Sequence, residues 1–161
     1  METLKILEDG LFAAIAAIGF SAISNPPRRA YLYCALIAAL GHSLRYILLN
    51  HPYFAFHIVV SSTLAAFVIG CLAVLLSPMA KTPAETCLFP SLLPMIPGIY
   101  AYKFFGGIAM CLFRSDESNF MHYFYLMATN GITCLFIILG MVIGATLPIF
   151  IFKRISFTAT R

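Results

Sequence analysis

Five long apolar stretches constrain the fold of this chain more than any other feature of its sequence. They cover residues 4–24, 30–49, 54–76, 88–113 and 120–152. A helix needs about 20 apolar residues to cross the hydrocarbon core of a bilayer, so each stretch is long enough for a crossing. The chain is 61% hydrophobic and 10% charged, whereas soluble domains carry about 25% charged residues. We therefore predict an all-α fold, a polytopic membrane helix bundle that forms a single domain in the lipid bilayer.

Polar or proline-containing segments separate the stretches, and they set the predicted boundaries. The first nine residues have mixed charge and lack the basic start of a signal peptide, so we expect the first stretch to be a retained helix. The last stretch is longer than one crossing needs, and its aromatic start at 123–125 suits the membrane interface. We therefore expect its spanning part at 128–151. The separating segments are 25–29, 50–52, 77–85 and 114–119.

The fourth stretch, 88–113, contains an unusual density of prolines. Pro90, Pro94 and Pro97 lie within eight residues and are followed by Gly98. Each proline removes a backbone donor and clashes with the preceding helical turn, so a continuous helix is not expected there. We predict a re-entrant or broken helix that restarts near Ile99. The chain then has five transmembrane helices, or four if the broken segment does not cross.

Basic residues near the ends of the stretches predict the orientation. With five spans, one side of the membrane carries more of them than the other, and cytoplasmic loops are enriched in Lys and Arg. We therefore expect a cytoplasmic C-terminus. The richer side holds Arg28, Arg29, Lys81, Lys153, Arg154 and Arg161, and the poorer side holds Lys5, Arg45 and Arg114.

Several function classes have no signal in the sequence. The chain lacks the nucleotide-binding, metalloprotease and serine-hydrolase motifs, so no catalytic residue, metal or cofactor is expected. No basic stripe with interleaved aromatics predicts nucleic-acid binding. The five cysteines show no C-x-x-C spacing and suit apolar packing. All six acidic residues lie near termini or loops, so we expect no acid-based proton relay from this chain alone and infer a partner.

The broken segment is the first candidate for a solute pathway. Non-helical backbone at membrane depth is tolerated where it is buried in protein or lines a wet cavity. A helix restarting after Gly98 would present the amides of residues 99–101, and Lys103 lies one turn further on. This chemistry suits a small anionic or zwitterionic solute. The alternative is a proline-rich surface loop. The candidate residues are Pro94, Pro97, Gly98, Tyr100 and Lys103.

Three polar residues in other stretches are further candidates. His42 and Arg45 are three positions apart and share one helix face. Arg45 either extends to the headgroups or lines an anion path, and His42 is either a hydrogen-bonded packing residue or a functional group. Asn130 serves either an interhelical hydrogen bond or solute contact.

Small residues at helical spacing predict close helix packing. Ala13 and Ala17 belong to one such series in the first stretch, and Gly140-x-x-x-Gly144 forms a second motif in the last. Both patterns allow two backbones to approach closely.

Two sequence elements carry a family resemblance. The first is Asn25-Pro-Pro-Arg-Arg29 followed by Ala38-Ala-Leu-Gly-His-x-x-Arg45, and the second is Thr82-Pro83 followed by Pro90-x-x-x-Pro-x-x-Pro-Gly-x-x-Ala-Tyr102. In this order they resemble the threonine/serine exporter family over residues 5–152. At this length the chain is most similar to the small, separately encoded subunit that corresponds to the C-terminal half.

The resemblance implies a bacterial inner-membrane exporter built from one long chain or from two subunits. The larger membrane subunit would supply the other helix bundle, and the solutes would be threonine, serine or small dicarboxylates such as succinate. A homo-oligomer is the expectation if this chain transports alone. The alternative function is a structural or assembly subunit that scaffolds another membrane protein without contacting solute. A membrane-embedded enzyme is not expected, because no nucleophile–base or metal constellation is visible.

Overall fold

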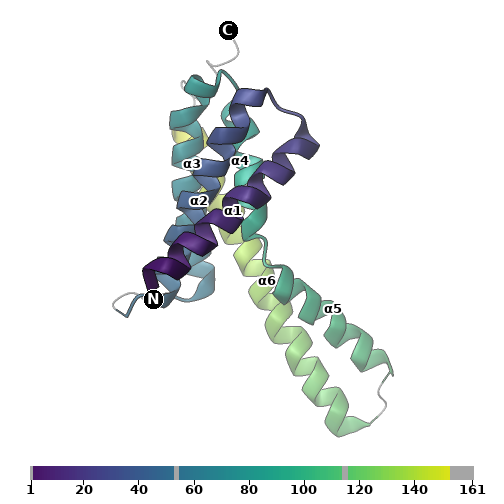
Figure 1. The fold of residues 1–161 in the computed structure, drawn as a ribbon. Coiled ribbons are helices and arrows are strands. Elements are labelled where there is room, and N and C mark those ends of the chain that lie inside the picture. Colours follow the sequence, from purple (N-terminus) through teal and green to yellow (C-terminus); the bar gives the residue numbers. More distant parts are fainter. Residues whose placement is uncertain (1, 53–54, 114–115, 153–161) are drawn as a thin grey trace. The chain divides into compact units, whose positions relative to one another are not determined.

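A computed structural model describes residues 2–52, 55–113 and 116–152, and these residues form helices joined by short turns (Figure 1). The all-α membrane fold predicted from the sequence is confirmed. Four helices, α1, α2, α3 and α6, are long and apolar enough to cross a membrane, and α4 with α5 make a fifth, broken candidate. In chain order the elements are α1 (Glu2–Ser24), α2 (Arg28–Asn50), α3 (Ile58–Ala80), α4 (Ala84–Leu92), a 3-10 turn η1 (Leu93–Met95), α5 (Gly98–Phe113) and α6 (Glu117–Ile151).

The helices belong to two compact units. The first unit holds α1 to α4, η1 and the part of α6 from Gly140 onward, and the second holds α5 and the part of α6 up to Leu139. Each unit is described separately below.

Small residues bring α1 and α2 together in the first unit (Figure 1). Ala13, Ala17 and Ala38 are buried in one cluster. A Cβ atom at Gly10 would lie 2.6 Å from the Ser43 hydroxyl, so only glycine fits there without a shift. Asn25 ends α1 with a φ of 47°, a left-handed conformation that asparagine tolerates better than most residues. Alanine and glycine at the contact therefore allow the close approach of the two backbones.

Glycines also set the contact between α3 and the C-terminal part of α6. A Cβ at Gly144 would lie 2.5 Å from the Thr63 carbonyl oxygen, and one at Gly140 would collide with the Thr63 hydroxyl. On the other helix, a Cβ at Gly70 would lie 2.5 Å from the Ala145 carbonyl. At Gly70 and Gly144 backbone atoms occupy the space of the missing side chain, so a rotamer change cannot accommodate a larger residue there.

The polar loop expected at 77–85 is present but limited to 81–83, because α3 continues to Ala80 and α4 begins at Ala84, and two prolines lie inside these helices. Pro78 lies in the last turn of α3, which continues to Ala80, and Pro90 lies inside α4. A proline leaves the carbonyl four residues earlier without its helical donor. In α3 the Ser77 hydroxyl donates to that carbonyl, Val74, at 3.1 Å. In α4 the Cys34 thiol lies 3.8 Å from the corresponding carbonyl of Thr86.

The predicted interruption of the fourth stretch is present, although its limits differ. We expected a re-entrant or broken helix over 88–113, and the structure has α4 over Ala84–Leu92, with η1 continuing to Met95. The break is confined to Ile96 and Pro97, and α5 begins at Gly98. The Cys34 thiol lies near the Thr86 carbonyl that Pro90 leaves without a helical donor, which is consistent with α4 continuing past Pro90.

Two other boundaries differ from the expected ones. The third helix begins at Ile58, where the His57 ring accepts a hydrogen bond from the Val59 amide at 3.4 Å, and the expected start at residue 54 lies outside the described residues. The last part of the loop expected at 114–119 is helical, because α6 begins at Glu117, and the stretch from residue 120 to the expected spanning part at 128–151 belongs to the same helix. At ~1.5 Å per residue, its 35 residues extend roughly 52 Å, well beyond a hydrocarbon core of about 30 Å.

The second unit is a hairpin of α5 and the first part of α6. Gly107 lies against Met127, and Gly131 lies against the ring of Phe104, with a virtual Cβ within 3.0 Å of its neighbour in both cases. Most large apolar side chains of the hairpin point away from this contact. Phe113 is 83% exposed and Tyr102 is 79% exposed. A two-helix hairpin of this composition needs lipid or another protein around it.

Candidate functional site

An acidic and an imidazole side chain of the first unit form a pair between α1 and α2. His42 Nδ1 lies 2.8 Å from Asp9 Oδ2, and the two side chains are 10% and 35% exposed. Asp9 lies seven residues, roughly 10 Å, after the start of α1 at Glu2. His42 lies eight residues, about 12 Å, before Asn50, the end of α2. The pair therefore lies within the length of two apolar helices, away from their ends.

Asp9 lies in the N-terminal part of α1, as expected, but its pairing with His42 was not predicted. Helix α1 begins at Glu2, so Asp9 is already two turns inside it. A signal for the pairing was present in the sequence. Asp9 is one turn before Ala13 and Ala17 on the same face, and His42 is one turn after Ala38. The helix face that carries the small residues therefore includes Asp9 on α1 and His42 on α2, each one turn beyond the small residues, where the two side chains meet.

The second nitrogen of His42 has an unusual environment. Nε2 is buried and has no hydrogen-bond partner among the residues that the structure describes. Buried polar atoms are paired in the great majority of cases, so an unpaired one needs an explanation. In the tautomer whose Nδ1–H donates to Asp9, Nε2 carries only a lone pair. A second proton on the ring would create a buried N–H group at this position.

Arg45 connects α2 to the end of η1. Its Nη1 donates to the Met95 carbonyl oxygen at 3.1 Å, and the side chain is half-buried. Met95 is the last residue before the break, where helix-end carbonyls have no intrahelical donor. The guanidinium therefore contacts protein at the interrupted segment, and its role in a pathway remains a prediction.

The residues around the break differ in burial and in their hydrogen bonds. Pro94 is half-buried in η1, and Pro97 is buried. The Gly98 amide donates to Ile96 at 2.8 Å, and a Cβ at Gly98 would meet nothing within 4 Å. The expectation that the Ala101 amide is available to a solute was wrong, because it donates to the Pro97 carbonyl at 3.1 Å.

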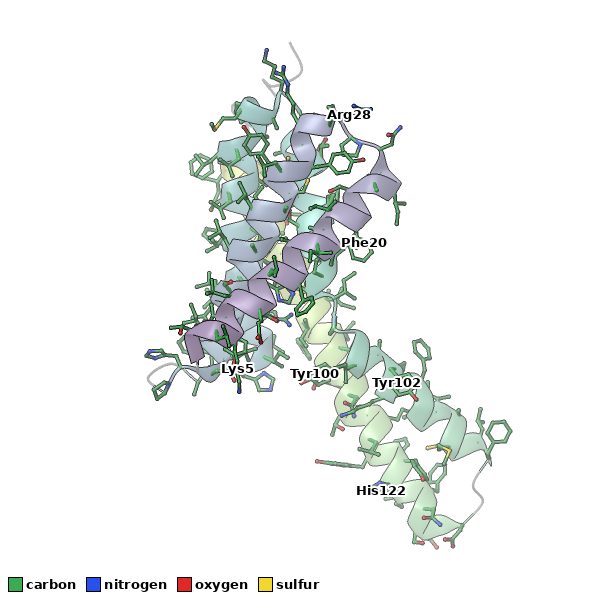
Figure 2. The ribbon with its side chains drawn as sticks, viewed as in Figure 1. Lys5, Phe20, Arg28, Tyr100, Tyr102 and His122 are labelled. Carbon is green, nitrogen blue, oxygen red and sulfur yellow. The ribbon has the colours of Figure 1, made fainter. Side chains whose placement is uncertain are left out.

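The candidates of the second unit lie on the hairpin. Figure 2 shows Tyr100 and Tyr102 near the start of α5. Tyr100 is half-buried and Lys103 is exposed. The Asn130 amide donates to the Leu126 carbonyl of its own helix at 2.7 Å, so its described bond is not the interhelical one that we expected. A role of Tyr100, Lys103 and Asn130 in the solute pathway stays a prediction.

A group of buried hydroxyls and thiols lies between α2 and α4, and we did not predict it. The Ser91 hydroxyl lies 2.9 Å from the Cys34 carbonyl and 2.7 Å from the Cys87 carbonyl, so it connects the two helices. Both cysteines and Ser91 are fully buried. The contact is long-range in sequence, so helix patterning alone gives no signal for it.

The remaining features of the first unit do not suit a polar solute. A cavity of about 210 Å³ between α4 and α6 has a mostly apolar lining. Within the described ranges, no three His, Cys, Asp or Glu side chains are grouped as metal ligands. The cavity is lined by Glu85, Leu88, Phe89, Leu92, Val142, Ala145, Thr146, Ile149 and Phe150.

Comparison with known families agrees with the motifs found in the sequence. The sequence profile of the family described as "Threonine/Serine exporter, ThrE" matches residues 9–151. The chain belongs to this family. The resemblance predicted from the proline and arginine motifs is thereby confirmed, and the match includes Asp9, His42 and Arg45.

One relative shows how this member of the exporter family compares in length. An uncharacterized protein of Haemophilus influenzae is 38% identical over 154 residues, which is 94% of this chain and 49% of the relative. The chain thus spans about half the length of this curated relative. No solved structure matches this chain. Family membership and the apolar helices together make the chain a multi-pass membrane protein of a transporter family.

Proposed function

We propose that this chain is a membrane subunit of a two-component exporter for small polar metabolites. The solutes are amino acids of the threonine and serine type or small dicarboxylates such as succinate. A larger membrane subunit of the same family supplies the second helix bundle. The proposal rests on family membership, on half-length coverage of the Haemophilus influenzae relative, and on the polar groups inside the apolar helices.

The observation that carries the proposal is the contact of Arg45 with the Met95 carbonyl at the break. A charged side chain at membrane depth is costly, so it is retained mainly where it serves a pathway or a partner. Its positive charge suits the carboxylate that threonine, serine and succinate share. A second cation, Lys103, lies on the exposed surface of α5 and suits the same anionic or zwitterionic class.

The partner is also supported by the exposed surface. Asp9 is 35% exposed, and the charged side chains of Lys5 and Glu8 beside it on α1 are exposed too. A carboxylate facing lipid is unfavourable, so this face suits a protein neighbour or a water-filled cavity. The larger subunit is the proposed neighbour, and a second copy of this chain is the alternative.

The proposed location is the bacterial inner membrane, with the C-terminus in the cytoplasm. Figure 2 shows Lys5 and Arg28 at opposite ends of the pair α1 and α2. Arg45 no longer counts as a loop charge, because it bonds to Met95, so the excess of basic residues on the proposed cytoplasmic side increases. A reporter fused after Arg161 tests this orientation directly.

Complementation tests the function. Cells that lack both subunits would be loaded with threonine, serine or succinate and would receive this chain, the larger subunit or both. We expect efflux only when both are present. Efflux with this chain alone would mean that it forms its own pathway, as a homo-oligomer, without the larger subunit. If the pair assembles in the membrane but changes the efflux of none of the three solutes, the proposal fails and a scaffold function is favoured.

A further inference from the structure

We propose that Asp9 and His42 together form the proton-binding site through which solute export is coupled to proton movement. This inference rests on the proposed function, because coupling has meaning only if the complex transports a solute. Asp9 and His42 come from different helices and meet at 2.8 Å, and both helices are candidate membrane spans. Such intramembrane pairs are typical of proton pathways.

The charge of the pair changes with one proton. With the carboxylate ionised and the imidazole neutral, the pair carries one negative charge. One proton taken from water makes the pair neutral overall, whether it resides on the ring or on the carboxyl group. A charge in a low-dielectric environment is costly unless it is paired, so the two states favour different surroundings. Protonation therefore favours closure of the site in apolar surroundings, and release of the proton favours contact with water.

One feature gives the proton access to the pair, and a second makes a proton on the imidazole ring costly. Asp9 is 35% exposed, so one end of the pair is accessible from the surface of the unit. The other end, His42 Nε2, is buried without a partner in the described part of the chain. A proton added to the ring would place a donor at Nε2, and an unsatisfied buried donor costs about 1–3 kcal/mol. The arrangement differs from a structural pair, in which both ring nitrogens are satisfied.

The nearest charged groups along α1 are Glu8, next to Asp9, and Lys5, one turn before it on the same face. On α2, Arg45 follows His42 by one turn and is bonded to the Met95 carbonyl. On α4, Glu85 lies beside Thr86, whose carbonyl is near Cys34, about 12 Å along α2 from His42. No Asp, Glu, Lys, Arg or His lies inside α3 or η1. The other ionisable groups of the elements packed against α2 are Lys5 and Glu8 of α1, which are exposed, and His57 at the start of α3.

The test uses this chain with its larger subunit, reconstituted in lipid vesicles. Two rates are compared for threonine and succinate: uphill accumulation driven by a pH gradient, and exchange of solute at equal pH on both sides. We expect Asp9→Asn and His42→Gln to lower gradient-driven accumulation at least about tenfold while exchange stays within about threefold of the unaltered complex. Glu8→Gln is the matched control, because Glu8 is an exposed acid next to Asp9, and it should change neither rate.

The outcomes separate the inference from the function. Gradient-driven accumulation that survives in both variants, or that is absent from the unaltered complex while exchange proceeds, overturns the proton site and leaves the exporter intact. Loss of exchange together with accumulation, in variants that still assemble with the larger subunit, assigns the pair to packing or solute contact and also overturns it. If the unaltered complex exchanges neither solute, the proposed function fails and the inference fails with it.

Discussion

The two units of this chain bury their side chains to very different degrees. In the first unit, α1 to α4 and the C-terminal part of α6 enclose a core that includes polar residues such as Ser61, Ser91 and His42. In the second, the α5–α6 hairpin buries little beyond its glycine contact at Gly107, and its phenylalanine and tyrosine side chains lie at the surface. Both units have similarly apolar sequences, so composition alone does not separate them.

The difference indicates where each unit finds its stability. Most of the buried hydroxyls of the first unit bond to backbone carbonyls, as Ser61, Ser77 and Ser91 do, which suits a helix bundle in lipid. The hairpin has few interior contacts to lose, so its environment, whether lipid or the proposed larger subunit, decides its stability. Substitutions in the first unit should therefore act on folding, whereas equivalent substitutions in the second should act mainly on what surrounds it.

The largest expected effect is a steric one in the first unit. Gly144→Leu would place a side chain where the Thr63 carbonyl oxygen is 2.5 Å from the first added carbon. Because backbone cannot move aside as a side chain can, we expect a loss of about 3 kcal/mol in the free energy of unfolding. The midpoint of thermal unfolding in detergent measures it.

The matched substitution in the hairpin is Gly106→Leu. A Cβ at Gly106 meets nothing within 4 Å, so the expected change is within about 0.5 kcal/mol and includes a small gain in helix propensity. Equal destabilisation by the two substitutions would contradict the contrast between the units.

The sequence predicted the fold better than the contacts, for physical reasons visible in particular residues. The all-helical fold with four to five candidate spans and the break near Pro97 follow from local composition and backbone chemistry, and both were predicted. The helical conformation at Pro78 and Pro90 was not, because it depends on Ser77 and Cys34 satisfying the freed carbonyls. One of these groups is close in sequence, but the other comes from a different helix.

The candidate site shows the same limit. His42 and Arg45 were recognised as polar residues in an apolar stretch, whereas their partners were not predicted. Asp9 lies 33 residues before His42, and Met95 lies 50 residues after Arg45. A single sequence gives no direct signal for contacts at such separations. Only the small-residue faces that contain Ala13 and Ala38 carried part of the information.

Smaller effects, on the rate of export, are expected when the positive charges of Arg45 in the first unit and Lys103 in the second are removed. Arg45→Gln removes the charge that contacts the end of η1, so we expect export by the assembled complex to fall about tenfold, equivalent to 1.4 kcal/mol. Lys103→Gln in the hairpin removes an exposed charge, and we expect a rise in KM of about threefold with little change in kcat. Initial export rates over a range of internal solute concentrations separate the two parameters.

Arg45→Lys is the companion variant for this comparison. It keeps the charge but not the planar guanidinium, so partial export is expected. A wild-type rate in Arg45→Gln, with normal amounts of protein in the membrane, would exclude Arg45 from the pathway. A tenfold loss in Lys103→Gln alone would move the main solute contacts to the hairpin.

The smallest effects are expected on the free energy of unfolding, when two polar side chains that bond to their own helices, Ser91 and Asn130, are replaced. Ser91 also reaches the Cys34 carbonyl of α2, whereas the described bond of Asn130 stays within α6. Ser91→Ala should lower the free energy of unfolding by about 1 kcal/mol, since it removes a buried connection between two helices. Asn130→Leu should change it by less than about 0.5 kcal/mol, because the helix keeps its backbone bonds. Chemical unfolding in mixed micelles measures both values. A larger loss for Asn130→Leu than for Ser91→Ala would mean that the hairpin depends on an interhelical contact of this amide, as the sequence had first suggested.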